Sequence, residues 1–176
     1  MTYGGGTQGV YAYDDMGRRV ESIEGSTSTL YAFNGTETLS EKTSAWTDYV
    51  YAAGLKIGKV SGSTVNYYQA DTLGSTRLVT DSSSNVHVLF SDSYQPFGQD
   101  KGASGNETYK FTGKPYSSSS QLQYNFQRWY DQSAGRFVSQ DPLAGFSSDP
   151  QSSNLYVYPL SSLKTLLGPA SEGIRE

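Results

Sequence analysis

Hydrophobic and polar residues alternate with a period of two along much of this chain. Two segments show this alternation most clearly. In the first, Val86, Val88 and Phe90 share one side, and in the second, Leu122, Tyr124 and Phe126 share one side. Such alternation is typical of a β-strand with one buried side. Helical periodicity is nearly absent, and only residues 160–167 could form a short helix. The pattern therefore predicts an all-β fold.

Turns rich in Asp, Gly and Pro separate the predicted strands. Four of them follow aromatic residues and lie at residues 13–18, 71–75, 94–98 and 130–136, and further loops are expected at 82–85, 102–107 and 117–120. Glycine takes a positive φ at no steric cost, which suits the tight end of a hairpin. The sequence thus predicts successive antiparallel β-hairpins laid side by side, followed by a short irregular or helical C-terminal tail.

The composition differs from that of an ordinary domain mainly in its high content of tyrosine. Only 35% of the 176 residues are hydrophobic, and 15 tyrosines stand against 7 phenylalanines. A low hydrophobic fraction leaves little for a thick core, whereas a tyrosine ring can pack while its hydroxyl stays hydrated. We therefore expect a wall one sheet thick, with tyrosines in half-hydrated positions.

The absence of some residue types, and the scattered positions of others, disfavour several classes of function. The net charge is −4 and the basic residues form no cluster, so nucleic-acid binding is not expected. The absence of cysteine excludes disulfides and thiolate metal sites. His87 is the only histidine and sits in an alternating segment, so neither a metal site nor a cofactor is expected. No apolar run is long enough to span a membrane, and residues 1–9 do not have the pattern of a signal peptide.

Five short motifs follow one another in the second half of the chain. They are YYQADTLGSTR at residues 67–77, YQPFG at 94–98, FTG at 111–113, RWYD with GRF and DP between 128 and 142, and NLYVY at 154–158. Together they resemble the RHS repeat-associated core domain of RHS/YD-repeat proteins, and residues 11–66 resemble YD repeats more loosely. The resemblance divides the chain into YD-repeat-like β-hairpins at 1–66, an RHS repeat-associated core domain at 67–158 and a divergent tail at 159–176.

The resemblance implies a fold and a role. Relatives wind hairpins into a hollow RHS/YD-repeat β-shell, found in secreted polymorphic toxins, toxin-complex subunits and cell-surface proteins, and variable C-terminal cargo is held inside. By this resemblance the chain is a non-enzymatic structural fragment of such a wall. Its implied partners are the remainder of the RHS shell and its cargo, and the parent protein would be extracellular or at the cell surface.

One pair of residues carries possible chemistry. Many relatives cut themselves after the core domain, and the resemblance assigns Arg128 and Asp141 to the catalytic arginine and the first of two catalytic aspartates. The hairpin pattern brings them together, because with residues 132–135 as the loop Tyr130 faces Phe137. In that register Arg128 and Asp141 are diagonal neighbours across the two strands.

The second carboxylate of that chemistry is missing. Two are required because one acts as a base while the other stays protonated. In the family the second Asp follows the NLYVY motif, whereas Asp149, the last Asp of this chain, precedes it. Arg128 also continues the face of residues 122–126, and a charge on such a mostly apolar face needs a partner. A structural ion pair is therefore favoured, with a self-cleaving aspartic peptidase module as the alternative.

Two further hypotheses stay open. The tail at residues 159–176 has no aromatic residue and is rich in leucine, which suggests a frameshifted or truncated gene or else a genuine short tail. Exposed aromatic side chains such as Trp46 and Trp129 would suit a carbohydrate-binding surface β-module that contacts glycans. Strands cut from a larger sheet would also leave open edges, so we expect the isolated chain to self-associate.

Overall fold

The computed structural model describes residues 9–141 and 155–156, and this part of the chain folds into fourteen strands with one short 3-10 helix. The first ten strands are β1 (Gly9–Tyr13), β2 (Arg19–Glu24), β3 (Thr27–Asn34), β4 (Glu37–Lys42), β5 (Trp46–Ala52), β6 (Leu55–Ser61), β7 (Thr64–Ala70), β8 (Thr76–Asp81), β9 (Val88–Ser91) and β10 (Ser104–Gly105). The others are η1 (Phe111–Gly113), β11 (Tyr116–Ser117), β12 (Leu122–Asn125), β13 (Arg128–Asp131) and β14 (Arg136–Phe137). The all-β prediction is confirmed, whereas the tail and the helix expected at 160–167 lie outside the described residues.

Both sheets are antiparallel meanders of neighbouring hairpins. Strands β1 to β10 form one sheet in chain order, and β11 to β14 form a second sheet in chain order. The predicted turns at 13–18, 71–75 and 82–85 separate β1 from β2, β7 from β8 and β8 from β9. The prediction of successive hairpins laid side by side is therefore confirmed.

An aspartate and a glycine build two of these turns. Asp14 Oδ1 accepts hydrogen bonds from two backbone N–H groups of its turn at 3.0 and 2.8 Å, and Asp71 Oδ1 accepts two in its own turn at 2.9 Å each. Gly17 and Gly74 follow three residues later with φ angles of 75° and 84°. The carboxylate satisfies the exposed amides while glycine takes the left-handed conformation, so the spacing D-x-x-G encodes the turn.

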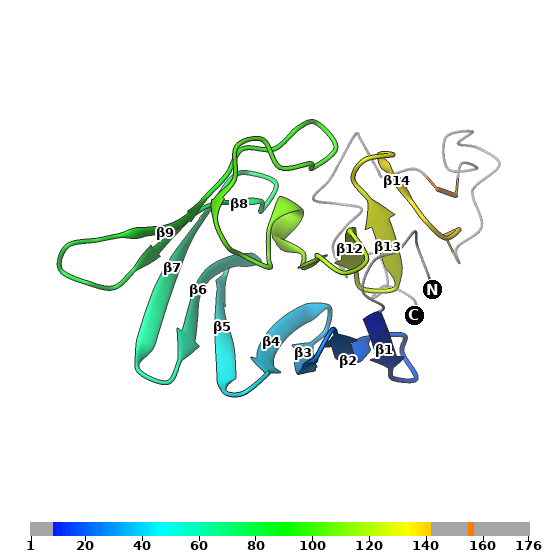
Figure 1. The fold of residues 1–176 in the computed structure, drawn as a ribbon, viewed down its shortest axis with the longest axis horizontal. Helices are drawn as coiled ribbons and strands as arrows, with labels where there is room; N and C mark the ends of the chain where they lie inside the picture. Colours follow the sequence, from blue (N-terminus) through cyan, green and yellow to red (C-terminus); the bar gives the residue numbers. More distant parts are fainter. Residues whose placement is uncertain (1–8, 142–154, 157–176) are drawn as a thin grey trace.

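Regularly placed β-bulges curve the ten-stranded sheet into a wall. The register shifts by one residue in five strand pairs, β1–β2, β3–β4, β5–β6, β7–β8 and β8–β9. The extra residues are Val20, Leu39, Ile57, Arg77 and Leu89. Each bulge bends its strand and increases the local twist. Figure 1 shows the resulting curved sheet, with η1, β12 and β13 lying on its concave side.

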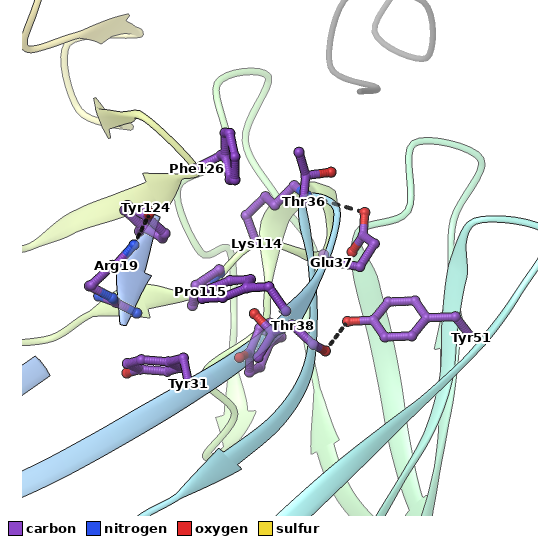
Figure 2. A pocket seen from close by; sticks show the side chains of 13 residues that line it. Arg19, Tyr31, Thr36, Glu37, Thr38, Tyr51, Lys114, Pro115, Tyr124 and Phe126 are labelled. Atoms are coloured by element: carbon purple, nitrogen blue, oxygen red, sulfur yellow. Dashed lines mark hydrogen bonds and ion pairs between the residues drawn. The ribbon is translucent and has the colours of Figure 1, made fainter. Parts of the chain in front are cut away.

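A row of tyrosines lines the concave side of this wall. The odd-numbered strands contribute Tyr11 (β1), Tyr31 (β3), Tyr49 (β5) and Tyr68 (β7). Figure 2 shows Tyr31 together with Tyr51, a second tyrosine of β5. Tyr49 and Tyr68 are only 7% and 6% exposed. The half-hydrated positions that the composition favoured are therefore wrong for these two rings, because Tyr109 packs on Tyr49 and Glu107 bonds the Tyr68 hydroxyl. Both residues belong to the segment of residues 94–132, hereafter the covering segment. The convex side instead exposes aliphatic side chains, among them Val10, Ile23, Leu30, Val50 and Ile57.

Three local expectations are wrong. Phe126 does not continue the face of Leu122 and Tyr124, because it lies in the turn between β12 and β13 with a φ of 61°. Arg128 therefore starts a new strand rather than extending that face. Residues 86–87 precede β9, and Val88 is 59% exposed although Phe90 is buried, so only one end of that segment meets the core. The loop expected at residues 102–107 contains the short strand β10.

The division of the chain at residues 66 and 67 stays a prediction. That boundary falls inside β7, which pairs with β6 on one side and β8 on the other.

Within the described residues, no helix has the length and apolar character needed to cross a membrane.

Candidate functional site

The motifs that are scattered between residues 67 and 137 meet in space. The first contact joins the turn before β8 to η1, where Thr112 N–H donates to Ser75 Oγ at 3.1 Å. The backbone N–H of Thr76 donates to the carbonyl of Lys110 at 3.0 Å. A Cβ at Gly113 would lie 3.0 Å from the carbonyl oxygen of Gly74, so the close approach of the two turns requires glycine there. The motifs at 67–77 and 111–113 thus form one packed junction.

The remaining motifs close around an aromatic core. Phe111, Tyr130 and Phe137 form a buried cluster, and Tyr94 packs against it. The Tyr94 hydroxyl donates to the carbonyl of Thr76 at 2.6 Å, and the Tyr130 hydroxyl donates to the carbonyl of the YQPFG residue 97 at 3.0 Å. The cluster therefore ties four of the five motifs to one another, which the sequence alone did not reveal.

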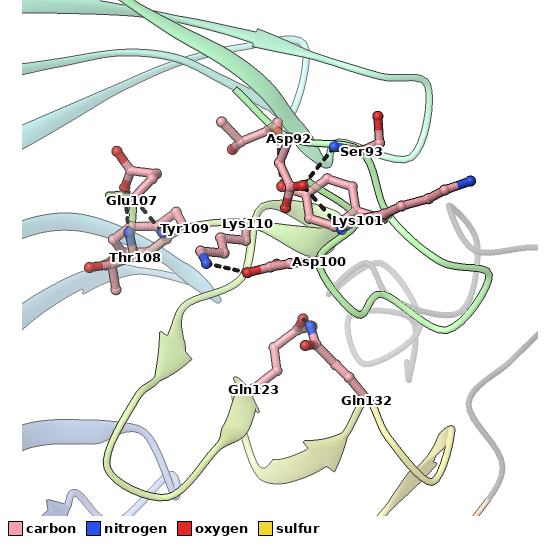
Figure 3. A network of polar contacts seen from close by, with 12 residues as sticks. Asp92, Ser93, Asp100, Lys101, Glu107, Thr108, Tyr109, Lys110, Gln123 and Gln132 are labelled. Atoms are coloured by element: carbon pink, nitrogen blue, oxygen red, sulfur yellow. Dashed lines mark hydrogen bonds and ion pairs between the residues drawn. The ribbon is translucent and has the colours of Figure 1, made fainter. Parts of the chain in front are cut away.

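A buried amide pair crosses the four-stranded sheet. Gln123 is fully buried, and its Oε1 accepts a hydrogen bond from Nε2 of Gln132 at 2.9 Å (Figure 3). Its own Nε2 donates to Asn125 Oδ1 at 3.1 Å. The alternation along residues 122–126 placed this glutamine on the solvated side, which is wrong, because Gln123 and its neighbour Tyr124 are both buried, at 0% and 4% exposed.

The candidate pair Arg128 and Asp141 lies at the edge of this junction. Strands β13 and β14 pair Tyr130 with Phe137, as the predicted hairpin register requires. Arg128 Nη1 lies 2.9 Å from Asp141 Oδ2, and the two side chains are 20% and 30% exposed. The guanidinium also lies 3.7 Å from the ring centroid of Phe137. Burial lowers the pKa of Arg128, and the Asp141 carboxylate partly offsets this effect.

The NLYVY motif returns to the same place. The backbone N–H of Phe137 donates to the carbonyl of Tyr156 at 3.0 Å, and that of Asp141 donates to the carbonyl of Leu155 at 2.9 Å. The fifth motif therefore lies beside the strand and the aspartate that form the ion-pair site. The catalytic assignment of Arg128 and Asp141 stays a prediction, because an ion pair stacked on a ring is equally what a structural role requires.

Sequence reasoning missed a buried carboxylate at the centre of the wall. The Glu107 side chain is 2% exposed, and its Oε2 accepts hydrogen bonds from Lys59 Nζ at 2.8 Å and from the Tyr68 hydroxyl at 2.9 Å. Its Oε1 accepts backbone N–H groups of Thr108 and Tyr109 at 2.9 and 3.1 Å (Figure 3). Glu107 thus fastens the covering segment to β6 and β7, and nothing in its local pattern distinguishes it from a loop glutamate.

A buried lysine stands beside it without a hydrogen bond. Lys56 Nζ lies 2.9 Å from the ring centroid of Tyr109 and 3.8 Å from that of Tyr49, and within the described residues it has no hydrogen-bond partner. Burial holds the pKa of Lys56 well below its usual range, although Glu107 and Glu41 oppose that shift. The concave side therefore places aromatic ring faces against cations.

Two carboxyl groups meet near the start of the covering segment. Asp92 is buried, and its Oδ1 accepts backbone N–H groups of Ser93 at 2.7 Å and Lys101 at 3.2 Å. Asp100 contacts Asp92 and forms an ion pair with Lys110 at 2.6 Å. Burial raises the pKa of Asp92, and its hydrogen-bond contact with the Asp100 carboxyl raises it further. Asp92 therefore binds a proton more readily in the folded protein than in the unfolded chain.

Replacing Asp92 with asparagine is expected to stabilise the protein at neutral pH by about 1 kcal/mol, because the amide donates to Asp100 without adding a negative charge. Since the folded pKa of Asp92 lies above the unfolded one, its protonation stabilises the fold below the unfolded pKa, and this contribution is lost as the pH rises through the folded pKa. The advantage of D92N should therefore shrink as the pH falls toward about 4. Urea unfolding across this pH range measures it.

The exposed Asp48 provides the matched control. Its carboxylate accepts a hydrogen bond from Ser40 on the surface at 2.6 Å, so D48N should leave the stability within about 0.5 kcal/mol at every pH. A D92N protein that is less stable than the unchanged protein at neutral pH would show that Asp92 is charged there and bound favourably.

The two tryptophans proposed for sugar binding differ in their surroundings. Trp129 donates from Nε1 to the Tyr13 hydroxyl at 3.0 Å, and its ring centroid lies 4.8 Å from that of Tyr11. Trp46 is 52% exposed and has Lys42 Nζ 5.6 Å from its ring. Of the two tryptophans, Trp46 alone presents a largely free ring to solvent.

The single histidine lies on a different hairpin from both tryptophans. His87 is at the tip of the β8–β9 hairpin, where Nδ1 is 2.8 Å from Asp81 Oδ2.

The same fold occurs within large toxin chains. The chain superposes on TcdB2-TccC3 without its hypervariable C-terminal region with a TM-score of 0.70 at 23% identity, and on the Photorhabdus luminescens Tc holotoxin pore with a TM-score of 0.69 at 20% identity. These alignments cover 93% and 96% of this chain but only 9% of each of those chains. No protein-family model matches the chain, and no curated protein matches it. The chain thus has an RHS-like shell fold and spans about a tenth of the length of these neighbours.

Proposed function

We propose that this chain is a non-enzymatic segment of the wall of an RHS-type β-shell. The observation that carries the proposal is the bulged ten-stranded meander, whose described strands β1 to β10 form a curved sheet that does not close on itself. A curved open sheet is suited to enclosing a space only when further hairpins extend it. The likeness to Tc toxin chains over 93 to 96% of this chain supports the same role.

The open edge of β1 indicates where the wall continues. Strand β1 pairs with β2 on one side, and within the described residues no strand pairs with its other side. Unpaired backbone groups on a five-residue edge strand offer a template for another strand. In the parent protein, the strand that pairs with β1 would belong to an earlier hairpin. The partners of this chain would then be the rest of the shell and its cargo, and the parent protein would be extracellular or at the cell surface.

We expect the isolated chain to self-associate through this edge in a concentration-dependent manner. Val10 is a 60% exposed residue of β1, and V10K should weaken association by about tenfold, because edge charges repel a second copy. Sedimentation velocity over a range of protein concentrations measures the change.

The control is a lysine in the middle of the same sheet. Val50 is 44% exposed on β5, which has strands on both sides, so V50K should leave self-association unchanged. A chain that stays monomeric at the highest concentrations reached, or that responds equally to both substitutions, would contradict an open edge at β1.

Self-cleavage is the second candidate, favoured by the Arg128–Asp141 contact at 2.9 Å. Because aspartic chemistry needs a second carboxylate and the sequence contains no Asp after Asp149, we expect the 19.2 kDa chain to stay intact on prolonged incubation. Intact-mass spectrometry of the unchanged protein and of D141N tests this. A discrete fragment that appears in the unchanged protein and disappears in D141N would establish the peptidase instead.

A further inference from the structure

A buried arginine on the concave side has four aromatic rings around its charge. Arg19 is 4% exposed, and its guanidinium carbon lies 4.6 Å from the ring centroids of both Tyr31 and Tyr124. Trp129 and Tyr11 lie slightly further away, at 5.4 and 5.7 Å. Ring faces attract a cation, but they do not replace the oxygen acceptors that a guanidinium fork normally binds.

One guanidinium nitrogen of Arg19 lacks a hydrogen-bond acceptor in the described part of the chain. Arg19 Nε is buried there without a partner, and the backbone N–H of Arg19 donates to the Tyr124 hydroxyl at 2.7 Å. Burying a cation without a compensating anion is costly. The unsatisfied donor is therefore an unusual feature that calls for a ligand.

Arg19 borders a small pocket that is partly open to solvent. Figure 2 shows it at one end, between Tyr124 and Tyr31, with Lys114 and Glu37 further along the lining. Lys114 and Glu37 pair with each other at 3.4 Å, so the lining has two cations against one carboxylate. A second buried polar atom without a partner in the described residues, Thr36 Oγ1, lines the same pocket.

We propose that this pocket binds a carboxylate group, with Arg19 as the residue that recognises it. A planar guanidinium matches a carboxylate with two parallel hydrogen bonds, and the low local dielectric beside the rings strengthens them. The pocket has room for about one or two water molecules, so it takes the acidic head group of a ligand rather than a whole molecule. The site does not depend on the role in a shell.

Acetate is the simplest probe of this site. The full chain is titrated with sodium acetate at constant ionic strength, with sodium chloride replacing it, while the arginine Nε–H resonances are followed by NMR. We expect the Arg19 resonance to shift and saturate with a dissociation constant of the order of millimolar. Acetamide, which has the same shape without the charge, should produce no saturable shift.

Variants assign the effect to one side chain. R19K keeps a charge among the rings but loses the fork, so acetate should bind about tenfold more weakly to it. R77M is the matched control, because Arg77 also lies over a tyrosine ring, 5.6 Å from Tyr94, yet donates to Ser93 Oγ at 3.2 Å. It should leave acetate binding unchanged.

Two acidic probes distinguish the source of the carboxylate. Glucuronate represents an acidic sugar and N-acetylaspartate an acidic protein side chain, and the tighter of the two identifies the class of ligand. A linear, unsaturable shift with acetate, or equal acetate binding by R19K and the unchanged protein, would overturn the proposal.

Discussion

Replacing Tyr130 with alanine is expected to lower the free energy of unfolding by about 3–5 kcal/mol. The Tyr130 side chain is fully buried against Phe111 and Phe137, with a ring-centroid distance of 5.6 Å to Phe137. Its removal leaves a cavity where the motifs meet and breaks the bond from its hydroxyl to a carbonyl of the YQPFG motif. Since small domains are stable by about 5–15 kcal/mol, this single change should bring the chain close to unfolding. Urea unfolding followed by circular dichroism measures it.

Two further tyrosine variants separate the causes. Y130F keeps the ring and loses only the hydrogen bond, so it should cost about 1 kcal/mol. Y67A removes a tyrosine that is 49% exposed on the convex side, and it should cost less than about 1 kcal/mol. If Y130A and Y67A proved equally mild, the motif junction would not be the core of the fold.

Replacing Glu107 with alanine is expected to cost about 3–5 kcal/mol. The change leaves the Tyr68 hydroxyl, Lys59 and two backbone N–H groups without the acceptor that all four now share. It also detaches the covering segment from β6 and β7, so the tyrosines on the concave side should become accessible. Thermal unfolding and hydrogen exchange of the amides in β7 measure both effects.

A partly exposed lysine–glutamate pair provides the comparison. Glu37 lies 3.4 Å from Lys114 with its side chain 37% exposed, so E37A should cost no more than about 1 kcal/mol. E107Q keeps the acceptor oxygen but loses the charge, and its cost should fall between the two. Equal effects of E107A and E37A would mean that the buried contacts of Glu107 do not hold the covering segment.

The hairpins could be predicted from the sequence because their signals are local. A D-x-x-G turn needs only residues 14–17 or 71–74, and the facing of Tyr130 and Phe137 follows from the length of one loop. The Arg128–Asp141 contact at 2.9 Å agrees with that register, although Asp141 lies beyond the end of β14. The sequence therefore predicts the strand order and the candidate pair, although not whether the pair reacts.

The side of the sheet that faces inward could not be predicted in this way. Period-two alternation is the same whether aliphatic or tyrosine side chains are buried, and here tyrosines such as Tyr49 lie inside while Val50 lies outside. The buried charges of Arg19, Lys56 and Glu107 depend on segments far away in the chain, which no local pattern encodes. Phe126 was misplaced for a related reason, because a two-residue turn with positive φ resembles a continuing strand.

The coding sequence upstream of this chain tests the shell proposal most directly. The wall repeats a tyrosine strand, a turn and a bulged return strand, with successive bulge residues Val20, Leu39, Ile57 and Arg77 spaced 18 to 20 residues apart. If the chain is a wall segment, the translated upstream DNA should encode more hairpins with this spacing and with Asp or Asn followed by Gly at their turns. A stop codon or an unrelated sequence directly upstream would contradict the account, because β1 would then have no earlier hairpin to pair with.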